Sequence, residues 1–139
     1  MTVHGGLLRL TTEGHGAIVD VTDGVRAIVA RSGVRTGVVV VFVTGSTAAM
    51  TTMEFEPGGV ADLQALLQRL VPVEGDYRHN VLNGDTNAYA HLRASIVGPS
   101  ESVPLVGGEL VLGTWQQLVL CDFDDRPRER RVTVQVLGE

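Results

Sequence analysis

The sequence predicts a single α+β domain with a mostly antiparallel or mixed sheet of about seven strands and about three helices. Three observations lead to this prediction. The chain has 139 residues, which is an ordinary length for one domain. Its apolar content of 44% is rich in Val and only 4% is aromatic, and a β-branched excess favours sheet. Strand-like segments lie at both ends of the chain, with helical segments between them.

The first third of the chain predicts two short strands, a helix and a long strand. The strands are expected over Leu7–Thr11 and Ala17–Val21. Thr22 then has the character of an N-cap, and Gly33 of the glycine that follows a helix. A nearly continuous β-branched run over Gly37–Thr44 predicts a strand buried on both faces.

The middle of the chain predicts two helices separated by a polar loop. Apolar residues at helical spacing indicate a helix over Val60–Leu70, which must end before Pro72. The segment Pro72–Asp85 reads as a loop, and Asn87–Val97 as a shorter helix that ends at Gly98.

The last third predicts four strands. A Gly107-Gly108 pair between Ser102–Val106 and Glu109–Leu112 is typical of a hairpin turn. The segments Trp115–Phe123 and Arg131–Leu137 complete the sheet. No repeat or linker is evident, so one domain is expected over residues 1–139.

Composition excludes several classes of chemistry. The net charge of −5 and pI near 5.3 argue against a general nucleic-acid binder. All eleven basic residues are Arg, so lysine Schiff-base chemistry and a phosphate loop that needs Lys are excluded. An anion site must therefore use Arg, backbone N–H groups or hydroxyls.

The sequence predicts a soluble cytoplasmic protein. Its single cysteine, Cys121, lies in an apolar strand, which favours a buried structural thiol and rules out a disulfide within the chain. The first residues lack the pattern of a signal peptide, and the longest apolar run, Val38–Val43, is too short to span a bilayer.

Two of the four histidines are candidate site residues. His4 lies near a terminus and His15 in a turn, where a solvated role is expected. His79 lies in the polar loop and His91 on the third predicted helix, where Asn87, His91 and Ser95 recur at i, i+4 and i+8 and share a face. This polar face fits a metal or ligand site, and it equally fits a solvent-facing side of the helix.

Other candidates each carry two interpretations. Glu54 is either a buried acid–base group with a raised pKa or a surface carboxylate at a strand end. The tripeptide Gly45–Thr47 after the buried strand can cradle an anion or form an ordinary loop. Arg126 lies in a charge run and can bind phosphate or face solvent. Trp115 is expected in the core or at a subunit interface.

In chain order, these segments resemble one known family over nearly the whole sequence, the YjbQ-like family, whose members carry the name secondary thiamine-phosphate synthase. The most specific parts are Asn87 through His91-Leu92 and Leu112-Gly113-Thr114-Trp115-Gln116. The other matching pieces are Ser32-Gly33-Val34, Gly37, Phe42-Val43, Ser46-Thr47-Ala48-Ala49, Glu54, Asp62, Val71-Pro72, Tyr77, His79, Gly98-Pro99-Ser100, Val103-Pro104, Asp122-Phe123-Asp124 and Arg126.

The resemblance implies a compact α+β trimer with a metal or ligand site formed by histidines and acidic residues. It also implies an enzyme that joins hydroxymethylpyrimidine diphosphate to thiazole phosphate with release of diphosphate, as a main or side activity. The chain departs from the family pattern at two positions: Gly45 stands where many members have His, and Met53 where many have Asn.

Carried onto this sequence, the resemblance assigns roles to individual residues. His79 and His91 are the expected ligands of a divalent metal, zinc or magnesium, and Glu54 and His91 the expected catalytic groups. A small phosphorylated molecule is the expected partner, without nucleic acid or membrane, and its anion contacts are Ser46, Thr47, Asn87, Ser95 and Arg126. Trp115 and the final strand are expected at the homotrimer interface. The alternative is a metal- or anion-binding oligomer without catalysis.

Overall fold

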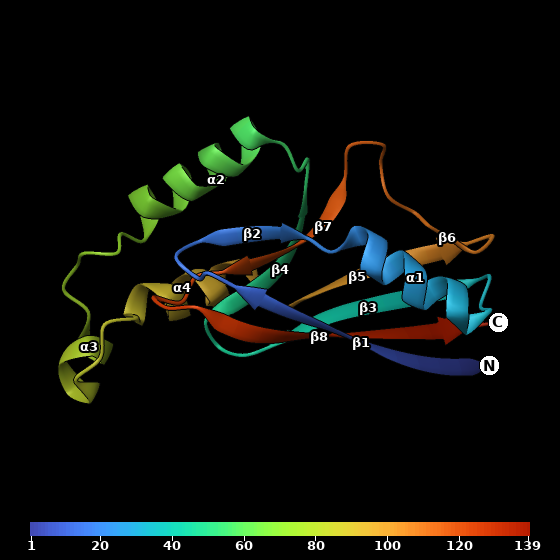
Figure 1. Ribbon diagram of the computed structural model, residues 1–139, viewed down its shortest axis with the longest axis horizontal. Coiled ribbons are helices and arrows are strands. Elements are labelled where there is room, and N and C mark those ends of the chain that lie inside the picture. Colours follow the sequence, from blue (N-terminus) through green and yellow to red (C-terminus); the bar gives the residue numbers. More distant parts are fainter.

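The computed structural model describes residues 1–139 and shows an α+β domain in which two antiparallel sheets and a layer of helices are stacked (Figure 1). The chain forms eight strands and four helices. In chain order these are β1 (Thr2–Thr12), β2 (Ala17–Asp20), α1 (Thr22–Ser32), β3 (Gly37–Thr44), β4 (Ala48–Met53), α2 (Pro57–Leu70), α3 (Arg78–Asn83), α4 (Ala88–Val97), β5 (Ser100–Val106), β6 (Glu109–Leu110), β7 (Gln117–Asp122) and β8 (Arg128–Gly138).

The larger sheet has the strand order β1-β8-β3-β5-β6, and every neighbouring pair is antiparallel. The final strand β8 lies between β1 and β3, so both of its edges are already paired. A contact of this strand with another subunit would therefore use its outward face rather than an edge. The free edges of this sheet belong to β1 and β6.

One face of the larger sheet packs on the smaller sheet, β2-β7-β4, to form the first hydrophobic core. In β3 the side chains of Val39, Val41 and Val43 are fully buried, whereas Phe42 between them is 42% exposed. The prediction that this strand is buried on both faces is thus wrong, because an antiparallel sheet with one covered face alternates buried and exposed positions.

A second core lies between the smaller sheet and the helices α2 and α4. Strand β7 joins the two cores: Leu118 and Leu120 face the first, while Val119 and Cys121 face the second. This strand is therefore buried on both faces along most of its length. Cys121 is fully buried, as predicted, and burial raises the pKa of its thiol to about 12.

Two elements were not predicted. Strand β4 was missed because its sequence Ala48–Met53 alternates poorly, and helix α3 lies inside the segment expected to be a loop. The other elements lie at the predicted positions, but β1 begins five residues before the predicted Leu7 and β8 three residues before the predicted Arg131, because the two strands pair along their whole lengths. Helix α1 begins at Thr22 itself rather than after it, because Asp20 Oδ1 accepts hydrogen bonds from both the backbone N–H and the hydroxyl of Thr22. Gly33 ends this helix in a left-handed conformation, as predicted.

Helix α2 starts from the end of β4 and leads towards α3, which lies at one end of the molecule (Figure 1). Glu56 caps α2 by accepting hydrogen bonds from the backbone N–H groups of Gly58 and Gly59. None of the four helices combines the length and the apolar character needed to cross a bilayer.

Candidate functional site

His79 on α3 and His91 on α4 lie side by side, although twelve positions separate them in the sequence. Their ring centroids are 4.7 Å apart, and the rings are tilted by 55°. The Nε2 atom of His79 is 3.2 Å from Oδ1 of Asn87 and 3.8 Å from Oδ2 of Asp85. Two imidazoles therefore present ring nitrogens within one small region, with an amide and a carboxylate beside one of them.

The segment before α4 is held in place by buried polar contacts. Arg93, on the inner face of α4, donates two hydrogen bonds to the carbonyl of Val71 at 3.0 and 2.9 Å, which fixes the end of α2. The hydroxyl of Tyr77 donates to the carbonyl of Pro72 at 2.6 Å. Asn80 of α3 accepts a hydrogen bond from the first N–H of α4 at 3.0 Å. These contacts hold α3 against the start of α4 and so keep the two histidines together.

The histidine pair lines a pocket of about 400 Å³. Its walls carry one aromatic ring, one guanidinium group, one carboxylate and two aliphatic side chains, from Tyr77, Arg78, Asp76, Ala88 and Leu92. This volume lies within the range of about 300–1,000 Å³ that small-molecule sites occupy. A mostly apolar cavity with a few convergent polar groups is the usual form of a small-ligand site.

The predicted polar face of α4 continues beyond the histidines to a second, smaller pocket. Ser95 lies one helical turn after His91, and its hydroxyl donates to the His91 carbonyl at 2.9 Å. Ser46, from the β3–β4 loop, lines the same pocket of about 180 Å³ as Ser95. The structure thus brings together two hydroxyls, both predicted as anion contacts, that lie far apart in the sequence.

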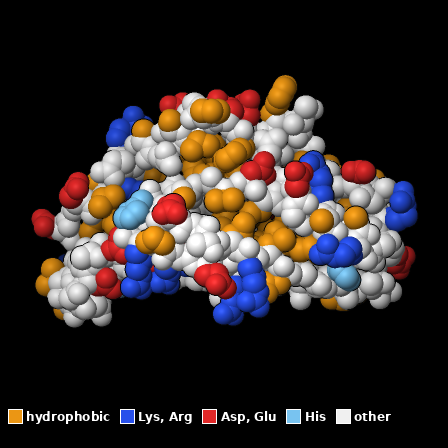
Figure 2. Space-filling view, viewed as in Figure 1, with side chains coloured by type: hydrophobic (Ala, Val, Ile, Leu, Met, Phe, Trp, Pro, Cys, Tyr) orange, Lys and Arg blue, Asp and Glu red, His pale blue; other side chains and the backbone are white.

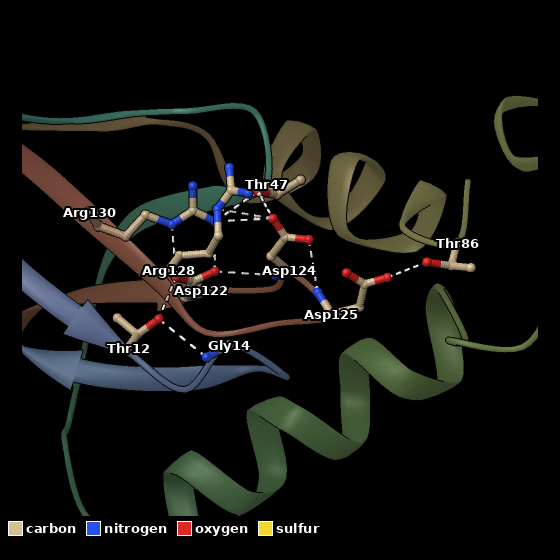
Figure 3. A network of polar contacts seen from close by, with 9 residues as sticks. All are labelled: Thr12, Gly14, Thr47, Thr86, Asp122, Asp124, Asp125, Arg128 and Arg130. Carbon is tan, nitrogen blue, oxygen red and sulfur yellow. Dashed lines mark hydrogen bonds and ion pairs between the residues drawn. The ribbon is translucent and has the colours of Figure 1, made fainter. Parts of the chain in front are cut away.

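A buried ionic network lies behind the β3–β4 loop (Figure 3). Arg130 of β8 donates to Asp122 of β7 through Nε at 2.8 Å and Nη2 at 2.7 Å, and Nη2 also donates to the hydroxyl of Thr47 at 2.7 Å. Thr47 in turn donates to Asp124 at 3.1 Å, and Thr12 of β1 donates to Asp122. Four separate parts of the chain are joined by this network.

Burial and hydrogen bonding act in opposite directions on the two carboxyl groups. Burial alone raises the pKa of Asp122, but hydrogen bonds from Arg130 and Thr12 and the Arg130 charge outweigh it, so the pKa of Asp122 is lowered. The pKa of Asp124 is also lowered. Burial raises it, but the hydrogen bonds from the Asp125 N–H and the Thr47 hydroxyl, together with the charge of Arg128, lower it by more. Both groups are therefore held as carboxylates.

Several predicted site residues do not join the histidine pair. Glu54 is exposed beyond the end of β4 and lines neither pocket, so of its two interpretations the surface carboxylate is the one observed. Arg126 is exposed in the β7–β8 turn, and no hydrogen bond or ion pair involves its side chain. The hydroxyl of Thr47 is buried with a partner on each side, so it belongs to the network rather than to an open anion site.

No group of three His, Cys, Asp or Glu side chains in the structure could hold a metal ion. The two histidines thus offer two nitrogen ligands to a metal ion. Asn87 has its side-chain oxygen directed at His79, so it orients the imidazole, while its amide NH2 group donates no hydrogen bond within the chain.

The surface of the molecule carries charges of both signs and exposed apolar side chains. Figure 2 shows acidic and basic side chains interspersed on one face, with apolar side chains gathered near its middle. Leu92 and Ile96 of α4 are also exposed. Trp115 is 70% exposed, so of its two predicted places the core is wrong.

The sequence did not reveal the network residues Asp122, Asp124 and Arg130. They belong to the charged segment around Arg126, which was expected to face solvent. A signal was present: Asp122 and Asp124, like Arg128 and Arg130, are two positions apart, and residues at that spacing share one face of a strand. Arg93 was also missed, because it stands alone among apolar helix positions.

Comparison with known proteins shows which family the chain and its fold belong to. The sequence model described as "UPF0047 protein YjbQ-like" matches residues 7–139. The chain belongs to this family. A UPF0047 relative from Methanothermobacter thermautotrophicus is 37% identical over all of this chain and 95% of its own length. Another, from Archaeoglobus fulgidus, is 40% identical over 94% of this chain and 98% of its own.

Solved structures of UPF0047 and YjbQ-like proteins have the same fold. A Sulfolobus solfataricus structure, titled a YbjQ-like protein of unknown function, superposes with a TM-score of 0.90 at 34% identity, covering 99% of this chain and 100% of that one. A hypothetical protein from Aeropyrum pernix gives a TM-score of 0.91 at 37% identity and covers 97% and 98%. The YjbQ-like fold predicted from the sequence is thereby confirmed.

Proposed function

We propose that the protein binds a small phosphorylated molecule along the polar face of α4 and transfers its organic group with release of diphosphate, as the name thiamine-phosphate synthase implies. The observation that supports this proposal is the paired arrangement of His79 and His91 at a pocket of about 400 Å³. This pocket has room for a heterocycle, and the smaller pocket with Ser46 and Ser95 lies one turn further along the same helix.

The bond changes of this reaction define what the protein must supply. The methylene carbon of the pyrimidine loses its bond to a diphosphate oxygen and forms a bond to the thiazole nitrogen. Diphosphate leaves with the electron pair of the broken bond, so the main requirement is stabilisation of negative charge on the leaving group. Tyr77, Leu92 and Ala88 provide walls for a flat ring, and the imidazoles provide donors to phosphate oxygens.

A divalent metal fits this site only in part. When bound, zinc or magnesium would neutralise charge on the departing diphosphate. Imidazole ligands suit zinc better than magnesium, which prefers oxygen. With His79 and His91 as the two protein ligands, substrate phosphate or water must complete the coordination.

The alternative function is binding without turnover. The exposed position of Glu54, outside both pockets, favours it, because the site then lacks the carboxylate that sequence comparison suggested as a base. A binder is stabilised by its ligand by about 2.7 kcal/mol at a ligand concentration of 100 Kd, without any associated rate.

The test is an assay for thiamine phosphate formation from the two phosphorylated precursors, with protein purified from a strain that lacks its own thiamine-phosphate synthase. The reaction is run with and without zinc and magnesium. His91→Ala is compared with His4→Ala, a matched control whose histidine lies on β1 opposite Val136. Turnover that is lost in His91→Ala and kept in His4→Ala supports the enzyme. Equal product at background level from all three proteins excludes thiamine phosphate formation as an activity of this protein.

We also propose that the protein assembles as a homotrimer, as the resemblance implies. Exposed apolar side chains at Leu92, Ile96 and Trp115 are surfaces that a partner subunit would cover. Light scattering in solution tests this directly, and a monomeric mass at micromolar concentration would rule the trimer out.

A further inference from the structure

The smaller pocket has a shape and lining suited to a compact anion. It lies between the β3–β4 loop and the last turns of α4, and its lining is formed by Gly45, Ser46, Ala48, Ala94, Ser95 and Pro99. Its volume of about 180 Å³ is below the range of about 300–1,000 Å³ for drug-sized ligands, so it suits a single small group. Two hydroxyls are the only side-chain polar groups in this lining.

A buried guanidinium group lies directly behind this lining. Arg130 is 3% exposed, and its Nε and Nη2 atoms are occupied by Asp122 and Thr47. The remaining nitrogen, Nη1, donates no hydrogen bond within the chain (Figure 3). Every fully buried side-chain nitrogen and oxygen in the structure has a partner, so Nη1 retains contact with solvent.

Gly45 forms the opening between Nη1 and the pocket. A Cβ atom built on Gly45 would lie 2.8 Å from Nη1, which places this nitrogen directly on the side-chain side of the glycine. Any larger residue at position 45 would thus fill the space in front of Nη1. The backbone here has a φ of +135°, a conformation that favours glycine.

The loop itself supplies further donors. The backbone N–H groups of Gly45, Ser46 and Thr47 donate no hydrogen bond to any other part of the chain. Backbone donors left without partners in a folded protein are normally satisfied by water or by a ligand. Successive free N–H groups beside a concave surface are a common element of anion sites.

The carbonyl end of α4 acts against an anion in this pocket, because Ala94 and Ser95 lie in its last turns. The two carboxylates and two guanidinium groups of the network also balance, so no net positive charge remains. Recognition must therefore come from directed donors. Hydrogen bonds from a buried guanidinium to an oxyanion are among the strongest in proteins and outweigh the effect of a helix end.

We propose that this pocket is a phosphate subsite in which Arg130 Nη1, the N–H groups of the β3–β4 loop and the hydroxyls of Ser46 and Ser95 hold a phosphate or diphosphate group. Ser95 reaches the ligand by turning its hydroxyl away from the His91 carbonyl. The inference deepens the proposed function, since it places the phosphate one turn of α4 from His91, with the organic group towards the histidine pocket.

Binding of pyrophosphate and of inorganic phosphate, measured by isothermal titration calorimetry, tests the subsite. Gly45→Ala blocks Nη1, and Ser46→Ala removes one hydroxyl without touching Arg130. Gly33→Ala is the matched control, because it strains a positive-φ glycine where a Cβ atom meets nothing within 4 Å. We expect the Kd for pyrophosphate to rise at least tenfold in Gly45→Ala and several-fold in Ser46→Ala, with Gly33→Ala unchanged.

A wild-type protein that binds neither anion, or a Gly45→Ala variant that is folded by circular dichroism and binds pyrophosphate like wild type, would overturn the subsite. The thiamine phosphate assay, run on the same set of variants, separates the two proposals. Turnover that depends on His91 with no effect of Gly45→Ala on pyrophosphate binding refutes the subsite alone. Loss of pyrophosphate binding in Gly45→Ala without any turnover in wild type refutes the reaction alone.

Discussion

Removal of the Asp122 carboxylate is the sharpest test of the buried network. In Asp122→Ala, the guanidinium of Arg130 keeps its buried position but loses the two hydrogen bonds at 2.8 and 2.7 Å and their negative partner. The hydroxyl of Thr12 loses its acceptor as well. The buried guanidinium then keeps only Asp124, 3.9 Å from its Nη2 atom, as a negative partner, so the change belongs to the strongly destabilising substitutions.

The expected loss follows from this geometry. Breaking a buried ion pair by removing one partner costs about 3–5 kcal/mol, against a total stability of about 5–15 kcal/mol for a native domain. For a domain of this size, with about 4 °C per kcal/mol, the melting temperature should fall by roughly 12–20 °C. The β3–β4 loop should loosen at the same time, because Thr47 is held by Arg130.

Urea denaturation followed by circular dichroism measures this loss directly; fluorescence of Trp115 is a poor probe because that side chain is 70% exposed in the folded state. Asp62→Ala on the exposed side of α2 is the matched control and should change stability by less than about 0.5 kcal/mol. The double variant Asp122→Ala/Arg130→Met should lose less than the sum of the two single changes, by about 1–3 kcal/mol. A loss below about 1 kcal/mol in Asp122→Ala, or strict additivity in the double variant, would refute the reasoning.

Three further predictions concern buried polar groups. Since the folded pKa values of Asp122 and Asp124 are lowered, their contribution to stability is present above the unfolded value of about 3.9 and is lost as pH falls through the folded values. Thermal unfolding measured between pH 7 and pH 2 should show this loss of stability in acid. A variant Asp122→Asn whose stability falls with pH as steeply as that of the wild type would contradict the prediction. Cys121 has a raised pKa of about 12 and is fully buried, so a thiol reagent at pH 8 should react only in denaturant; rapid labelling of the folded protein would contradict the buried position. Arg93→Met should cost about 1.5–3 kcal/mol and speed amide exchange in residues 72–87, because the carbonyl of Val71 loses both of its hydrogen bonds from this side chain; unchanged exchange would show that other contacts hold this segment.

Much of the fold could be predicted from local patterns. The helix that ends at Gly33, the strand Gly37–Thr44 and the helix that ends at Gly98 are all observed, because glycine C-caps and β-branched runs act over a few residues. Strand β4 was missed because its buried residues are Ala48 and Met50 on one face and Ala49 on the other, which carry little β signal and form a strand only through pairing with β7.

The candidate site was predicted only in part. The shared face of Asn87, His91 and Ser95 follows from helical periodicity, and the structure shows that periodicity in α4. The contact of His91 with His79 required α3 to form and to pack on the start of α4, through the Asn80 cap and the anchoring of Val71 by Arg93.

Sequence by itself thus determined the fold class, the family and the residues of one helix face, because these depend on order along the chain. Tertiary structure alone decided that Glu54 lies apart from the histidines, that Ser46 and Ser95 line the same pocket, and that Arg130 lies buried behind Gly45. Those relations join strands and helices that are tens of residues apart. They depend on the packing of the smaller sheet between two cores, and short-range patterns in a sequence carry no information about such packing.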